Sequence, residues 1–243
     1  MRYIKIEDLL VFRSRWGQGD TLWKNSVLKK DFRDFFHNKC WYTEVLLVGQ
    51  DVHIDHFRPK AAVKPFENFK YNHLIQDKGY YWLANDPSNY RACCIYANRK
   101  TGSGGKGNYF PLADDGVYQS EKDENNEHPM LLDPCVAEDV KLLSFLGNRV
   151  VPATDDELGK ERVRVSAFIY NLTDAYISNE RGKIWASIEQ LLTEFDSGDI
   201  SKSSCIRQLR DAISPKAPFS ACAIACVNSL APDEIKSELD LIL

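Results

Sequence analysis

The spacing of apolar residues changes near Asp155, and this change restricts the chain to a mixed fold. From Asp155 onward, apolar side chains recur every three or four residues, as in "ERVRVSAFIYNL", which is typical of amphipathic helices. Earlier residues form short apolar runs broken by glycine and proline, such as "VLLVGQDVHIDHFRP", which are typical of strands and turns. A chain that combines such strands with a long helical region is expected to have an α+β fold.

More detailed patterns predict individual elements. Apolar spacing predicts helices over residues 5–13 and 22–37, and the run quoted above predicts two short strands around the turn at 49–51. Asp86, Pro87 and Ser88 form a helix-start signal, which predicts a short helix over 89–97 with Asn98 just past its end. Gly147-Asn148 predicts a hairpin. The glycine-rich "KTGSGGKGN" lacks the spacing of a phosphate-binding loop and is interpreted as a plain loop.

Composition indicates a cytoplasmic protein. The chain has 243 residues, enough for one large domain or two small ones, and contains no apolar run of membrane-spanning length. Its first residues include charges within the apolar stretch and do not resemble a secretory signal. Seven cysteines are an odd number scattered along the chain, which favours reduced thiols over a disulfide framework.

Charge is distributed unevenly along the chain. Residues 53–106 have a net charge of +5, whereas residues 107–243 have a net charge of −11. The basic segment suits an anionic ligand, although ordinary surface variation explains such a balance about equally well. Strong binding of nucleic acid by this chain alone is not expected, because such affinity requires neutralising many phosphates.

Four polar residues in the basic segment could carry out phosphodiester hydrolysis: Asp55, His56, Asn89 and Asn98. This reaction needs a base for the attacking water and a positive centre for the charge that gathers on phosphate. A neutral imidazole suits the first task, and carboxylate and amide oxygens are suitable ligands for Mg²⁺. Adjacent strand residues point to opposite faces, so Asp55 and His56 can share a site only if the strand ends or bends there.

The segments "HIDHFRPK", "NDPSNYRACCIYANRK" and "GNYFPL" resemble HNH endonucleases of the ββα-metal fold. The resemblance covers residues 39–112. It implies that His56 is the general base, that Asp55 and Asn98 bind Mg²⁺ or Mn²⁺, and that Asn89 braces the loop beside the base. Because basic side chains make most contacts to phosphates, five residues are candidates for holding the nucleic-acid backbone. They are Arg58, Lys60, Arg99, Lys100 and Lys106.

The segment "EHPMLLDPC" and the helical tail resemble one branch of this family, the HNH subunit of Septu-type antiphage systems, including retron-linked ones. This likeness implies an ATPase subunit as partner and, in the retron-linked case, a reverse transcriptase and its RNA. The expected organisation is an N-terminal helical segment over 1–38, the HNH core over 39–112 and a mostly helical region over 113–243. The acidic last region is expected to dock the partner, and no membrane is expected to take part.

The cysteines depart from the family pattern. Many relatives have two Cys-x-x-Cys pairs that bind a structural zinc, whereas here the corresponding pairs are Cys40 with Thr43 and Cys94 with Ala97. Two thiolates make an incomplete site, so we expect no structural zinc and expect Trp41 and its neighbour Tyr42 to replace it by packing. A site completed by His37 or Cys93 is the less favoured alternative.

Other interpretations of these residues remain open. His53 lies two residues before Asp55 and therefore on the same strand face, where it is either a further ligand or, as we favour, a hydrogen-bonded structural residue. No suggestive spacing involves His73 or His128, which are interpreted as structural or surface residues. At the level of the whole protein, the alternative to a nuclease is an inactive HNH-shaped scaffold that binds a partner.

Overall fold

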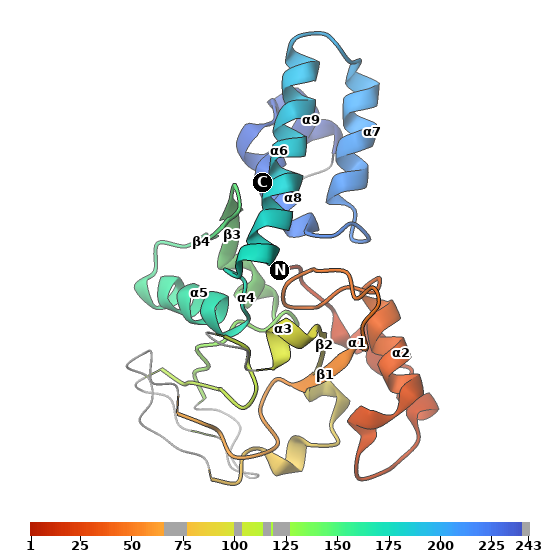
Figure 1. Ribbon diagram of the computed structural model, residues 1–243, viewed down its shortest axis with the longest axis vertical. Helices are drawn as coiled ribbons and strands as arrows, with labels where there is room; N and C mark the ends of the chain where they lie inside the picture. The colour runs from red at the N-terminus through yellow and green to blue at the C-terminus, as the bar shows by residue number, and fades with distance from the viewer. Residues whose placement is uncertain (66–76, 100–103, 114–117, 119–126, 240–243) are drawn as a thin grey trace.

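The computed structural model describes residues 1–65, 77–99, 104–113, 118 and 127–239. Its helices and strands are α1 (Ile6–Leu10), α2 (Ser26–Phe35), β1 (His53–His56), β2 (Tyr90–Cys93), α3 (Ile95–Asn98), α4 (Ala137–Lys141), β3 (Leu143–Leu146), β4 (Arg149–Pro152), α5 (Glu157–Ile169), α6 (Ala175–Asp196), α7 (Lys202–Ile213), α8 (Ser220–Leu230) and α9 (Asp233–Glu238). The strands form two separate antiparallel pairs, and the longest helices follow them. The fold is therefore α+β. Figure 1 shows α6 to α9 gathered at one end and β1, β2 and α1 to α3 toward the other.

The N-terminal helices are shorter than the apolar spacing predicts. The segment 5–13 contains only the five-residue α1, and the segment 22–37 divides into a short 3-10 turn and α2. Asn25 marks the division, because its side-chain oxygen accepts hydrogen bonds from the backbone N–H groups of Val27 and Leu28. A residue that caps in this way begins a new helix, and apolar periodicity alone does not detect it.

The central segment differs from the prediction in two ways. Only one strand, β1, forms around the turn at 49–51, because the preceding residues make just a single bridge, between Leu46 and Lys39. The predicted helix over 89–97 is wrong: β2 and the short α3 occupy this segment, and Asn98 is the last residue of α3.

The helix-start signal is nevertheless used. The side chain of Asp86 accepts a hydrogen bond from Ser88 N and caps a single 3-10 turn, after which the chain extends and pairs with β1. All four residues of β2 are buried. A strand that is buried on both faces lacks the alternation of apolar and polar residues by which sequence patterns reveal strands.

The C-terminal half follows the prediction more closely. The hairpin at Gly147-Asn148 is confirmed as β3 and β4, and helices occupy most of the chain from Glu157 onward. The long helical pattern is divided between α5 and α6 at Asn171, whose left-handed backbone (φ 55°) does not continue a right-handed helix. Cys222 and Cys226 lie buried in α8, as expected for small core residues.

A buried polar cluster joins the two halves of the chain. The carboxylate of Glu44 lies 3.5 Å from the ammonium group of Lys39 and accepts a hydrogen bond of 2.9 Å from the Ser220 hydroxyl. Lys39 also donates to the carbonyl oxygen of Ala217.

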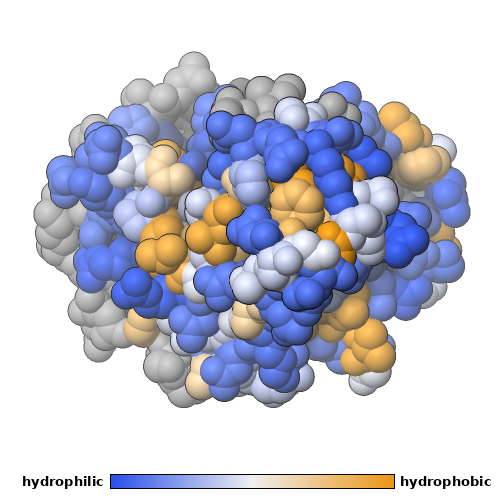
Figure 2. Space-filling view, turned by 90° about the horizontal axis from the view of Figure 1, so that it is seen from above, coloured by the Kyte–Doolittle hydropathy of each residue, from blue (hydrophilic) through white to orange (hydrophobic). Residues whose placement is uncertain are grey.

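Within the described residues, no helix has the length and apolar character needed to cross a membrane. Figure 2 shows one end of the molecule, where hydrophilic residues surround smaller hydrophobic groups.

Candidate functional site

The candidate site lies where β1 ends beside β2 and α3. Asp55 pairs with Arg91 and His56 with Tyr90 in the antiparallel register, and α3 begins directly after β2. The Arg91 guanidinium forms two short bonds, of 2.5 and 2.7 Å, with the buried carboxylate of Asp133, which fixes β2 from behind. Bidentate pairs of this kind restrain both partners, so the strand ends on a rigid support.

Asp55 points into the protein. Its side chain is only 4% exposed, and its carboxylate accepts a hydrogen bond of 2.7 Å from the Tyr42 hydroxyl. The ammonium group of Lys106, which is fully buried, lies 3.2 Å from one carboxylate oxygen and 3.1 Å from the other. Burial raises the pKa of the Asp55 carboxyl, against the opposing effects of Lys106 and of the Tyr42 hydrogen bond.

His56 contacts a different set of neighbours, as alternation along a strand requires. Its Nε2 lies 3.0 Å from the carbonyl oxygen of Ala84, and its ring is flanked edge-on by Trp23 and Tyr90. Because a carbonyl only accepts, Nε2 carries the proton and the lone pair of the neutral ring lies on Nδ1. Burial lowers the pKa of His56 to about 4, so the ring is neutral at physiological pH.

Asn89 joins the turn before β2 to the segment after β1. Its side-chain oxygen accepts a hydrogen bond of 2.8 Å from Arg58 N, and its amide nitrogen donates one of 2.9 Å to Arg58 O. The Asn89 carbonyl also accepts from Phe57 N. These three bonds fix the backbone directly after His56, and this is the position in which the resemblance places a loop-bracing asparagine.

Asn98 contacts His53, for which the sequence favoured a structural role. Its amide nitrogen lies 3.2 Å from Nδ1 of His53, and both side chains are partly exposed. Burial, together with the charges of Arg99 and Lys29, lowers the pKa of His53. The expected structural role of His53 agrees with this hydrogen bond. The four candidate side chains therefore do not converge on one point. Those of Asp55, His56, Asn89 and Asn98 each contact different partners.

The five candidates for holding a nucleic-acid backbone have different environments. Arg99 is exposed, whereas Lys60 is partly buried over the Trp23 ring at 4.7 Å. Arg58 donates a bond of 2.6 Å to Glu127. Lys106 lies fully buried against Asp55 and does not reach a surface phosphate in this arrangement. Lys100 lies outside the described residues, as does His73.

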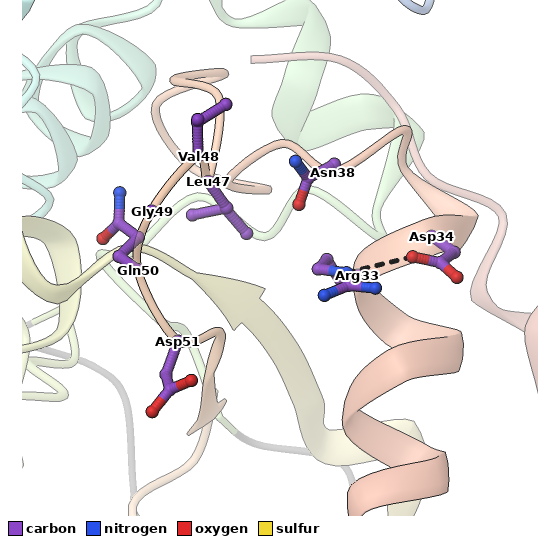
Figure 3. Close-up of a pocket in the computed structure, with 8 residues that line it drawn as sticks. All are labelled: Arg33, Asp34, Asn38, Leu47, Val48, Gly49, Gln50 and Asp51. Carbon is purple, nitrogen blue, oxygen red and sulfur yellow. Dashed lines mark hydrogen bonds and ion pairs between the residues drawn. The ribbon is translucent and has the colours of Figure 1, made fainter.

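An open groove of about 780 Å³ lies between α2 and the loop that leads into β1 (Figure 3). Arg33 lies on the α2 side and is paired with Asp34 at 3.0 Å, and Asp51 lies at the end nearest β1. The residues that line it are Arg33, Asp34, Asn38, Leu47, Val48, Gly49, Gln50 and Asp51. Its lining mixes both signs of charge, so it lacks the uniformly basic character of a phosphate-binding track.

A divalent ion does not fit Asp55 in this arrangement. Mg²⁺ usually binds one or two carboxylates together with waters, but both oxygens of Asp55 face buried Lys106, and one also accepts the Tyr42 hydrogen bond. Within the part of the chain that the structure describes, no three His, Cys, Asp or Glu side chains gather as a metal-binding group.

The knuckle at residues 40–43 packs closely against its surroundings. The hydroxyl of Thr43 lies 3.9 Å from the sulfur of Cys94. Trp41 stacks on Phe32 at 5.4 Å between ring centroids, and Tyr42 stacks on another tyrosine ring at 4.0 Å. This knuckle is therefore held by aromatic stacking, as the sequence interpretation expected of Trp41 and Tyr42.

The sequence did not indicate that Tyr42 and Lys106 are the hydrogen-bond and ion-pair partners of Asp55. Tyr42 was treated only as packing and Lys106 only as a phosphate contact, yet both bind Asp55. The available signal for Lys106 was its position between two glycines, because a flanking glycine permits close backbone approach.

Comparison with known proteins adds no assignment. No family model matches the chain. No curated protein sequence matches it either.

Proposed function

We propose that this chain is an HNH-type endonuclease that hydrolyses phosphodiester bonds of nucleic acid. The observation that carries the proposal is the succession of β1, β2 and α3, with Asp55 and His56 at the strand end, Asn89 bracing the next segment and Asn98 closing the helix. This order and these residue types agree with the ββα arrangement that the resemblance implies. DNA is the favoured substrate over RNA, and an antiphage defence complex with an ATPase subunit is the proposed setting.

His56 is the proposed general base. The carbonyl of Ala84 holds Nε2 in its protonated form, which leaves the Nδ1 lone pair to accept a proton from the attacking water. Asn89 holds the adjoining backbone and thereby fixes the position of the ring. A pKa of about 4 makes His56 a weak base but keeps it unprotonated over the physiological range. Mg²⁺ or Mn²⁺ belongs to the proposal through the resemblance, and its entry at Asp55 requires a rearrangement.

The test is cleavage of labelled nucleic acid by the full chain, with and without its partner and with Mg²⁺ or Mn²⁺. We expect His56→Asn to abolish cleavage while leaving the circular dichroism spectrum unchanged. His37→Asn is the matched control, because His37 is exposed and far from β1 in sequence, and its left-handed backbone (φ 53°) is one that asparagine tolerates. Cleavage that persists in His56→Asn at the wild-type rate excludes this residue as the base.

An inactive scaffold is the second candidate function. The observation that favours it is burial: Asp55 is 4% exposed and His56 is 6% exposed, and Asp55 is already ion-paired. A scaffold predicts that the complex with its partner neither cleaves nucleic acid nor binds a divalent ion. Calorimetric titration of that complex with Mn²⁺ separates the two functions.

A further inference from the structure

Trp23 contacts two of the residues on which the candidate site depends. Its ring centroid lies 5.1 Å from that of the His56 imidazole, at an interplanar angle of 75°. The ammonium group of Lys60 lies over the same ring, 4.7 Å from its centroid. One tryptophan therefore meets both the candidate base and a cation four residues further along the chain. It belongs to the N-terminal segment, outside the residues that resemble HNH endonucleases.

The segment that holds the imidazole also holds Trp23. The tryptophan lies in a 3-10 turn, in which the N–H of Leu22 donates a hydrogen bond of 3.1 Å to Oδ1 of Asn85. The preceding residue, Ala84, provides the carbonyl oxygen that lies 3.0 Å from Nε2 of His56. Two successive residues thus fix the tryptophan turn and the imidazole relative to one another.

The surrounding rings restrict how the His56 side chain can turn. The hydrogen bond to Ala84 fixes one ring nitrogen, but a ring held at a single atom can still swing about that atom. Trp23 and Tyr90 oppose this motion, because each meets the imidazole at 75°, with centroids 5.1 and 5.0 Å away. Edge-to-face contacts at such distances are favourable. The direction of the Nδ1 lone pair therefore depends on both rings.

The face of the Trp23 ring determines where the Lys60 ammonium lies. A cation over a ring face is attracted by the negative charge there, and its N–H groups can still donate to an oxygen. Lys60 is only partly buried, so a ligand at the surface can reach it. Burial is the main cause of the low pKa of His56, and the charge of Lys60 lowers it further, so the two groups lie near each other. A phosphate bound by Lys60 would therefore lie beside the imidazole.

We propose that Trp23 is a positioning residue of the candidate site: its ring fixes the direction of the His56 imidazole and holds the Lys60 ammonium beside it, where that ammonium binds a phosphate of nucleic acid. Trp23 itself does not touch the reacting atoms. The inference rests on the proposed function in taking His56 as the base and nucleic acid as the ligand.

Steady-state cleavage by the full chain with its partner separates the two effects of the ring. We expect Trp23→Leu to lower kcat at least about tenfold, because the base is misplaced, and to raise KM. Trp23→Phe keeps a ring and should recover most of kcat. Lys60→Met should mainly raise KM, whereas Lys141→Met removes a charge from a side chain that is 74% exposed and should change neither constant. Equal kcat in Trp23→Leu and the wild type, or equal losses in Trp23→Leu and Trp23→Phe, overturns the inference.

Nuclear magnetic resonance tests the geometry without cleavage. With isotope-labelled methyl groups added to the lysines, the Lys60 signal should be shifted upfield by the Trp23 ring. This shift should disappear in Trp23→Leu, while the Lys141 signal should be the same in both proteins. An unshifted Lys60 signal in the wild type overturns the inference.

The same signals test the phosphate contact. A DNA oligonucleotide at saturating concentration, added to the full chain with its partner, should move the Lys60 signal and leave the Lys141 signal in place. A Lys60 signal that the oligonucleotide does not move overturns the inference. A Lys60 signal that depends on Trp23 and moves with the oligonucleotide, in a complex that never cleaves, contradicts the nuclease proposal alone.

Discussion

Replacing Lys106 with methionine is expected to reduce the free energy of unfolding by about 3–5 kcal/mol in the absence of divalent ions, the usual cost of leaving a buried charge without its partner. Lys106 has no exposed surface and Asp55 is 4% exposed, so water cannot replace the lost ammonium group. The Tyr42 hydroxyl would remain as a partner of the carboxylate. The loss should be smaller at pH 5 than at pH 8, because burial raises the pKa of Asp55 and its carboxyl can then take up a proton.

The two partners should not act independently. Asp55→Asn alone leaves a buried ammonium group without its carboxylate and should cost a similar amount. The double variant contains neither charge, and its amide still accepts the Tyr42 hydrogen bond. We therefore expect the double variant to be at least about 2 kcal/mol more stable than the sum of the single effects predicts.

Urea unfolding, followed by circular dichroism and tryptophan fluorescence, measures these free energies. Coincident transitions with an unchanged dependence on urea establish that the four proteins can be compared. Single effects below about 1 kcal/mol, or effects that add within about 0.5 kcal/mol, would refute the reasoning. Either result would mean that the ammonium group and the carboxylate are not coupled in the folded protein.

Three further predictions concern the same region. Burial lowers the pKa of His56 to about 4 in the folded protein, whereas the unfolded value is about 6.5. The free energy of unfolding should therefore fall by about 3 kcal/mol in all as the pH drops between these values. His56→Gln should remove this part of the pH dependence, measured by urea unfolding. Gly104→Ala would place a methyl group 1.7 Å from Oδ1 of Asn171 and should cost about 1–3 kcal/mol, whereas Gly19→Ala, with open space around it, should change stability by less than about 0.5 kcal/mol. Asn89→Ala should lower the free energy of unfolding by about 1–3 kcal/mol. It should also slow cleavage more than it weakens nucleic-acid binding. Equal effects on cleavage and binding would argue against a positioning role.

Sequence patterns predicted those parts of the fold in which one face of an element is buried. The helices after Glu157 and the hairpin at Gly147-Asn148 have such patterns, and both are present. The pattern fails where an element is buried on every side. In β2, Tyr90 and Cys93 are as buried as the residues between them, so nothing in the sequence separates this strand from a buried helix.

The candidate site was predicted in part. The resemblance grouped Asn89 and Asn98 with the end of β1, and in the structure Asn89 bonds to the segment after β1 and Asn98 to His53. The role of Lys106 could not be predicted, because lysine is almost always exposed, and its flanking glycines permit close backbone approach without indicating which group the side chain contacts. Nor could the sequence indicate that Asn98 would meet His53, since that contact depends on the register of β1 and β2, which brings His53 opposite Cys93 shortly before α3.

Asp55 and His56 face different neighbours, yet a single group links them. The Lys106 ammonium holds the Asp55 carboxylate and the His56 backbone carbonyl at the same time. The Ala84 carbonyl holds the imidazole from another side, so His56 is restrained through both its backbone and its ring. Loss of the Lys106 charge is therefore expected to disturb the end of β1 as well as the Asp55 carboxylate, whereas the hydrogen bond between His56 and Ala84 should remain.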